Sequence, residues 1–159
     1  MKIAVMYQSL RGGTRRAADT IANSFQSLGA SVGIYPVTNI DAQFVLDADL
    51  LVIGTWTDGL FGIGAKPAQI GKLNALPDMS QRKASLFVTY EISPTKSLQQ
   101  FEEWAQGRGV DLVHKQGFKV RGPFSKDISS EVADFTQRSI EAITPTAVSY
   151  THLTLPTKA

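Results

Sequence analysis

The sequence of 159 residues contains no cysteine and only two histidines, His114 and His152. The absence of cysteine excludes disulfide bonds, cysteine-ligated iron–sulfur or zinc sites, and thiol catalysis. It therefore also excludes the cysteine-containing phosphate loops of low-molecular-weight phosphatases and arsenate reductases. Two histidines are too few for a histidine-rich metal site.

Long apolar runs and strong charge of either sign are also missing. No run of about 18 apolar residues is present, so the sequence predicts no membrane span. The apolar stretch near the N-terminus is too short for a signal peptide, and a cytoplasmic location is the default expectation. The formal net charge is only +2, with lysine and arginine scattered along the chain, which gives little support to nucleic-acid binding.

What the chain does contain is an alternation of apolar runs and amphipathic segments. Five runs are predicted as strands: Lys2–Tyr7, Ser31–Val37, Leu50–Thr55, Ala84–Tyr90 and Asp111–Val120, the last irregular around Gly117. Helical spacing predicts helices at Thr14–Leu28, Asp41–Leu46 (short), Pro67–Leu76, Lys96–Gln106 and Ile128–Ile143. The glycine-containing segment Trp56–Lys66 is predicted as a loop.

Strands that alternate with helices predict a three-layer, doubly wound α/β domain with a parallel sheet. We expect this domain to span residues 1–145 and residues 146–159 to form a disordered or artefactual tail. The tail segment Val148–Thr157 is also what the sequencing-adaptor codons GTC TCT TAT ACA CAT CTG ACG CTG CCG ACG would encode. An ordinary tail is the alternative interpretation, and His152 carries no functional weight in either case.

Ligands of such sheets bind at the carboxyl ends of the strands, which directs attention to three loops. The first, Ser9-Leu10-Arg11-Gly12-Gly13-Thr14, joins the first strand to a helix. Its hydroxyls, its glycines and the helix N-terminus suit a phosphate. The spacing matches neither the nucleoside-triphosphate loop nor the dinucleotide fingerprint. A plain strand-to-helix turn capped by serine and threonine is the alternative.

The other two loops carry aromatic residues. Thr55-Trp56-Thr57-Asp58-Gly59 follows the third strand, and Thr89-Tyr90-Glu91 ends the fourth. An aromatic face at a strand end can stack on a flat ligand, although the tryptophan taken by itself is more often one that covers the edge of the core. Two aromatics and a phosphate cradle together suit a planar heterocycle with a phosphate tail, such as flavin mononucleotide (FMN).

On these residues the chain resembles the flavodoxin family over about residues 1–145. Ser9, Gly12 and Thr14 match the family's phosphate loop, and Thr55, Trp56 and Gly59 match its second loop. The resemblance implies a sheet order of 2-1-3-4-5 and an FMN cofactor held by the first loop. It also implies that Trp56, with Tyr90 as a second candidate, flanks the isoalloxazine ring.

Two departures bear on function. Arg11 replaces the hydroxyl residue usual in the phosphate loop, and it either pairs with the phosphate or faces solvent. The chain also lacks the acidic character of the electron-carrier flavodoxins, which argues against a very low reduction potential. We expect electron transfer with a protein partner. The alternatives are an NAD(P)H-dependent quinone reductase and a binding module that has lost the flavin, so the sequence leaves open whether the protein is an enzyme.

Overall fold

The computed structural model describes residues 1–10, 12–60, 63–120 and 127–145, and it contains a parallel sheet of five strands. These strands are β1 (Lys2–Tyr7), β2 (Ser31–Pro36), β3 (Leu50–Leu60), β5 (Lys83–Tyr90) and β6 (Asp111–Lys119). They lie in the order β2-β1-β3-β5-β6, and each pairs with its neighbour in parallel. This is the predicted order 2-1-3-4-5, with one further strand inserted in the chain after the third.

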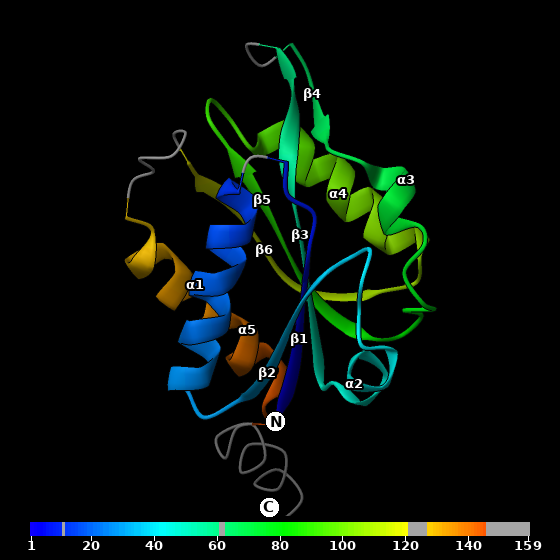
Figure 1. The fold of residues 1–159 in the computed structure, drawn as a ribbon, viewed down its shortest axis with the longest axis vertical. Coiled ribbons are helices and arrows are strands. Elements are labelled where there is room, and N and C mark those ends of the chain that lie inside the picture. The colour runs from blue at the N-terminus through cyan, green and yellow to red at the C-terminus, as the bar shows by residue number, and fades with distance from the viewer. Residues whose placement is uncertain (11, 61–62, 121–126, 146–159) are drawn as a thin grey trace, which may run out of the picture.

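Helices cover both faces of the sheet, which gives the three layers visible in Figure 1. On one face lie α1 (Gly13–Ser27) and α5 (Ser129–Ile143). On the other lie α2 (Ala42–Asp47), α3 (Ile70–Leu73) and α4 (Thr95–Gly107). None of the helices in the described ranges is long and apolar enough to cross a membrane.

The core consists of two apolar clusters, one on each side of the sheet. Along β3, Leu50 and Val52 belong to the cluster under α1 and α5, whereas Leu51 and Ile53 belong to the cluster under α4. This alternation is the period of two expected for a strand that is buried on both faces. Gly54 continues the pattern without a side chain, because a Cβ there would lie only 2.0 Å from the ring of Phe87.

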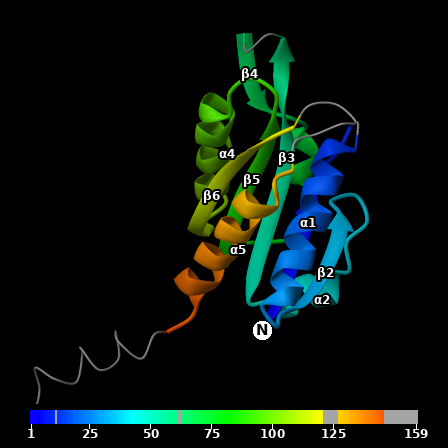
Figure 2. The same cartoon turned by 90° about the vertical axis from the view of Figure 1, so that its left-hand side faces the viewer.

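The prediction of a loop at Trp56–Lys66 is wrong. β3 continues to Leu60, and β4 (Ile63–Pro67) pairs with it in the antiparallel direction as a hairpin. Figures 1 and 2 show this hairpin extending beyond the other strands at the carboxyl end of the sheet. The glycines suggested a loop, but pairing between the two arms supplies the backbone hydrogen bonds that a strand leaving its sheet would otherwise lack.

Two smaller predictions are also corrected. The helix predicted for Pro67–Leu76 is limited to α3, because Pro67 pairs in β4 and Gln69 has a positive φ of 52° that delays the start of the helix. The irregularity of β6 lies at Val113, where the register with β5 shifts, rather than around Gly117. The last helix ends at Ile143, and residues 146–159, including the predicted tail Val148–Thr157, lie outside the described residues.

Candidate functional site

The carboxyl ends of the parallel strands and the N-termini of α1, α4 and α5 lie at the same end of the molecule (Figure 1). The loop that follows β1 is tied into the sheet at its first residue, because the Gln8 N–H donates to the Gly54 carbonyl at 2.9 Å. The three segments selected from the sequence, the second of which lies within β3, therefore meet at this edge. Within the described ranges, no group of three or more histidine, aspartate or glutamate residues is placed to hold a metal.

A hydroxyl oxygen holds the described residues of the first loop together. Ser9 Oγ accepts hydrogen bonds from the backbone N–H groups of Gly12, at 3.1 Å, and of Arg15, at 3.3 Å. Gly12 has a φ of +87°, a conformation that glycine adopts at little cost and that turns the chain into α1. The first turn of α1 contains no acidic residue, so its dipole is not offset by a negative side chain.

A pair of hydroxyls joins this loop to the middle of the site. Thr14 Oγ1 and Thr89 Oγ1 lie 2.8 Å apart, and both residues are buried. Two hydroxyls carry two O–H groups, and their mutual hydrogen bond uses only one of them. The pair thus fixes the start of α1 against the end of β5 and keeps one O–H for another acceptor.

Trp56 lies on the same face of the sheet as this pair. Thr55 donates to the Ala68 carbonyl at 3.0 Å and Thr57 Oγ1 lies 2.7 Å from Ser97 Oγ, so both threonines face α3 and α4. Strand alternation then directs Trp56 to the face of α1. In the sheet register Trp56 is paired with Thr89, which brings the indole beside the hydroxyl pair.

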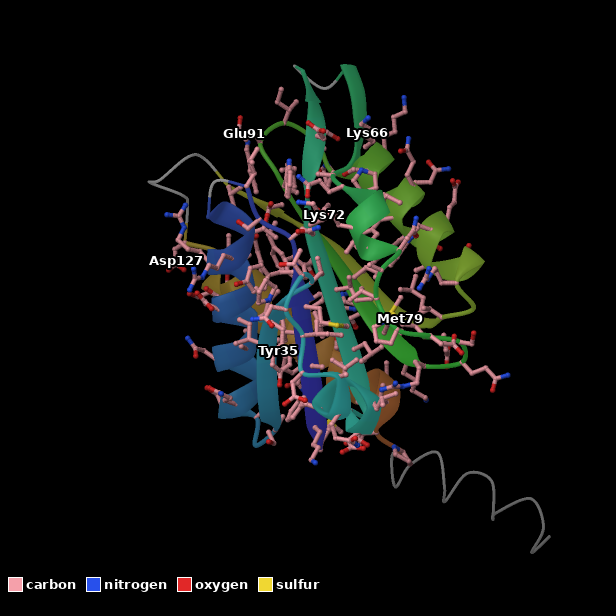
Figure 3. The ribbon with its side chains drawn as sticks, turned by 45° about the vertical axis from the view of Figure 1, so that its right-hand side comes forward. Tyr35, Lys66, Lys72, Met79, Glu91 and Asp127 are labelled. Carbon is pink, nitrogen blue, oxygen red and sulfur yellow. The ribbon has the colours of Figure 1, made fainter. Side chains whose placement is uncertain are left out.

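The predicted residues of the third loop lie on different faces of the sheet at the end of β5. Thr89 contacts Thr14, whereas Tyr90 lies on the α4 face, where a Cβ at Gly117 would meet its ring at 3.0 Å. Glu91 is exposed, and Figure 3 places it at the same end of the molecule as Lys66 of β4. The structure thus brings Thr14, Trp56 and Thr89 together, and it places Tyr90 on the opposite face.

The remaining predicted residues differ in what the structure says of them. Leu10 is 66% exposed at the tip of the first loop. Asp58 is exposed and Gly59 belongs to β3, both within the hairpin. Arg11 lies outside the described residues.

Sequence reasoning missed two residues of this edge. Ser97, in the first turn of α4, holds Thr57 and also donates to the Pro94 carbonyl at 3.2 Å. Gln8 is buried beside the first loop. Polar residues at the end of an apolar strand were the available signal for Gln8, but nothing in the local pattern distinguished Ser97 from an ordinary helix-start serine.

At the start of α5, Asp127 accepts hydrogen bonds from the Ser129 hydroxyl at 2.6 Å and the Ser129 N–H at 2.9 Å. These two bonds lower the pKa of the Asp127 carboxyl below its ordinary value, the hydroxyl contributing more than the N–H. Asp127 is fully exposed, so its negative charge lies on the surface at this edge and not in its interior.

Several solved structures with this fold are flavodoxins. The two-electron reduced flavodoxin of Megasphaera elsdenii is 16% identical, with 87% of this chain and 98% of that chain covered and a TM-score of 0.71. The chain has the flavodoxin-like fold.

Oxidised Flavodoxin 2 from Bacillus cereus is 22% identical to this flavodoxin-like chain, with 89% and 99% of the two chains covered and a TM-score of 0.68. The rubredoxin oxygen:oxidoreductase of Desulfovibrio gigas matches over 89% of this chain but only 36% of its own, at 21% identity and a TM-score of 0.68. No protein-family model and no curated protein matches the chain.

Proposed function

We propose that this protein binds FMN at the carboxyl edge of its sheet and transfers electrons to or from a protein partner in the cytoplasm. The observation that carries the proposal is the contact of Thr14 with Thr89, which is paired in the sheet with Trp56. This contact places the N-terminus of α1, which suits a phosphate, next to the indole ring of Trp56, which suits a flat heterocycle.

The residues of the first loop fit a phosphate. The N–H groups of Gly12 and Arg15 fix the Ser9 hydroxyl at the start of α1, where its own O–H can donate to an anion, and the first turn of α1 carries no carboxylate to repel one. A Cβ built at Gly12 would meet nothing within 4 Å, so the loop leaves open space on that side. Ser9, Gly12, Gly13 and Thr14 would hold the phosphate, and Leu10 would lie at the rim.

The residues after β3 and β5 would hold the flavin ring. Trp56 is half-buried on the face of the hydroxyl pair and is the first candidate to flank the ring. Tyr90 is the second candidate, and it would have to contact the ring from the α4 side of the sheet edge. The segments that contain Thr55, Thr57, Asp58, Gly59, Thr89 and Glu91 would complete the proposed surroundings, through the backbone at Thr55 and Thr57, whose side chains face α3 and α4.

Bound FMN would supply the electron-transfer chemistry, and the protein would supply position and electrostatics. The hydrogen bond between Thr57 and Ser97 fixes the base of the hairpin to α4. Trp56, which precedes Thr57, is therefore positioned by both β3 and α4. The proposal requires no acid or base from a side chain.

The test is the absorption spectrum of the purified protein, followed by titration of flavin-free protein with FMN and with riboflavin. We expect flavin absorption bands and tighter binding of FMN than of riboflavin, since riboflavin lacks the phosphate. A colourless protein that does not bind added FMN would contradict the proposal and favour a non-redox binding module. Oxidation of NAD(P)H with a quinone acceptor by the purified protein alone would favour a quinone reductase over an electron carrier.

A further inference from the structure

Gln8 has a buried side-chain amide with no hydrogen-bond partner. The residue is 7% exposed, and its Nε2 atom contacts no acceptor within the part of the chain that the structure describes. Its backbone, by contrast, is fixed, because the Gln8 N–H donates to the Gly54 carbonyl at 2.9 Å. The amide is therefore buried beside a fixed backbone, and its N–H groups have no acceptor among the described residues.

An unused buried donor destabilises the protein that carries it, because the group has left water without gaining a partner. A leucine of similar size would fill the same space without this cost. Buried polar groups without partners are rare enough in folded proteins that each calls for an explanation. A bound ligand that supplies the missing acceptor is one such explanation.

The position of Gln8 favours a ligand over a packing defect. Gln8 comes directly before Ser9, whose hydroxyl organises the first loop, and it is bonded to the residue that precedes Thr55 and Trp56. Within the described ranges the other buried side-chain nitrogen without a partner is His114 Nε2. That imidazole lies against Phe135 in the middle of the α5 face, with ring centroids 5.4 Å apart, and not at the carboxyl edge.

We propose that the Gln8 carboxamide donates a hydrogen bond to an oxygen of the bound ligand. This inference rests on the proposed function, and the ligand is then FMN. The acceptor is an oxygen either of the phosphate or of the flavin portion, and both offer the same chemistry to an amide N–H. Gln8 thus lowers the stability of the flavin-free protein and strengthens the binding of FMN.

The test compares Gln8→Leu with the wild-type protein in two measurements. The first is titration with FMN, followed by quenching of flavin fluorescence, and we expect binding to weaken about tenfold, as for the loss of one hydrogen bond. The second is thermal unfolding of the flavin-free protein, for which we expect a midpoint equal to or above that of the wild type. A purely structural role would lower the midpoint and leave FMN affinity unchanged.

Gln116→Leu is the matched control, because Gln116 also lies near the end of a strand but donates to the Glu131 carbonyl, at 3.4 Å. It should lower the unfolding midpoint without changing FMN affinity. Gln8→Met, which is unbranched like glutamine, repeats the test with a different shape. Riboflavin binding distinguishes the two acceptors: if Gln8→Leu also weakens riboflavin about tenfold, the flavin portion is the acceptor, and if only FMN weakens, the phosphate is.

Three outcomes would overturn the inference. Equal FMN affinity of the wild type and Gln8→Leu would show that the Gln8 amide does not contact the ligand. Loss of folding in both Gln8 variants would show that the amide is needed by the free protein. Failure of the wild type to bind FMN would overturn the proposed function together with this inference, whereas the first two outcomes leave the proposed function standing.

Discussion

At the scale of single residues, the contact between Thr14 and Thr89 decides how firmly the first loop is held. Replacing either threonine by valine keeps the shape and removes one hydroxyl of the 2.8 Å pair. We expect each single variant to lose about 1 kcal/mol of unfolding free energy and the double variant to lose less than the sum. Urea denaturation of the four proteins of this cycle measures the coupling.

Thr20→Val is the control for that cycle. Thr20 is half-buried on α1, and its hydroxyl donates to the Arg16 carbonyl one turn earlier. A change within about 0.5 kcal/mol is expected there. Strict additivity of Thr14→Val and Thr89→Val would show that the two hydroxyls do not depend on each other.

Arg11 is the residue of the first loop that differs most from the flavodoxin pattern. If its guanidinium pairs with the FMN phosphate, Arg11→Ala should weaken FMN binding about tenfold or more, as expected for a charge-assisted hydrogen bond, and leave riboflavin binding unchanged. Fluorescence titration with both ligands measures the difference. Arg138→Ala is the control, because Arg138 is exposed on α5 and pairs with Asp134. Unchanged FMN affinity of Arg11→Ala would mean that Arg11 does not pair with the phosphate.

Asp127 gives a pH-dependent prediction with a defined sign. Its pKa in the folded protein is lowered, first by the Ser129 hydroxyl and then by the Ser129 N–H. A lowered folded pKa stabilises the protein above the ordinary pKa of aspartate, and this contribution is lost as pH falls through the folded pKa. NMR titration of the carboxyl carbons should show a raised Asp127 pKa in Ser129→Ala. Ser80→Ala, which removes the similar hydroxyl contact of Asp78, should leave the Asp127 pKa unchanged.

At the scale of elements, the central strands β1, β3 and β5 were predictable because they are buried on both faces. Residues such as Leu50 to Ile53 form a continuous apolar run that no surface segment would carry. The hairpin of β3 and β4 was not predictable, because its stability comes from pairing between Thr57 and Pro67 and from contact with α4, neither of which is visible in a local window. The left-handed conformation of Gln69, which shortens α3, was hidden for the same reason.

The residues of the candidate site were predictable only in part. The first loop was predictable from the local sequence, because Ser9, Gly12 and Thr14 are residue types that suit a turn from a strand into a helix N-terminus. Which face each residue of the third loop occupies depends on its position in the sheet. Thr89 shares a face with the buried Phe87, and Tyr90 therefore takes the other. Gln8 follows an apolar strand in the sequence, but its burial, which distinguishes it from other polar residues, is visible only in the folded chain.

The hairpin makes a prediction at its own scale. Thr57→Val removes the contact with Ser97 but leaves the bond from Ser97 to the Pro94 carbonyl in place. We expect the base of the hairpin to open more often, so that the Ala68 N–H, which donates to the Trp56 carbonyl at 2.9 Å, exchanges about fivefold to tenfold faster. Native-state hydrogen exchange measures this, and amides in the middle of α1 serve as the internal reference. Equal exchange of Ala68 in both proteins would show that the contact with α4 does not hold the hairpin.

At the scale of the whole molecule, net charge bears on the proposed redox chemistry. The formal net charge of +2 contrasts with the acidic surface usual among flavodoxin electron carriers. Negative charge near a flavin disfavours its reduction, so this chain, if it binds FMN as proposed, should hold the flavin at a less negative potential. A partner that donates to or accepts from this protein would then work outside the lowest range of biological potentials.

Ligand binding and folding are linked across the whole chain, because the proposed site is built from the ends of β1, β3 and β5 and exists only in the folded state. A ligand at a hundred times its dissociation constant adds about 2.7 kcal/mol to the unfolding free energy. For a domain of this size, FMN at that concentration should raise the unfolding midpoint by about 5 to 10 °C. Differential scanning calorimetry of the flavin-free protein measures the shift, with riboflavin at equal concentration as the control. A midpoint that FMN does not move, even at millimolar concentration, would mean that the edge built from Thr14, Trp56 and Thr89 serves another ligand.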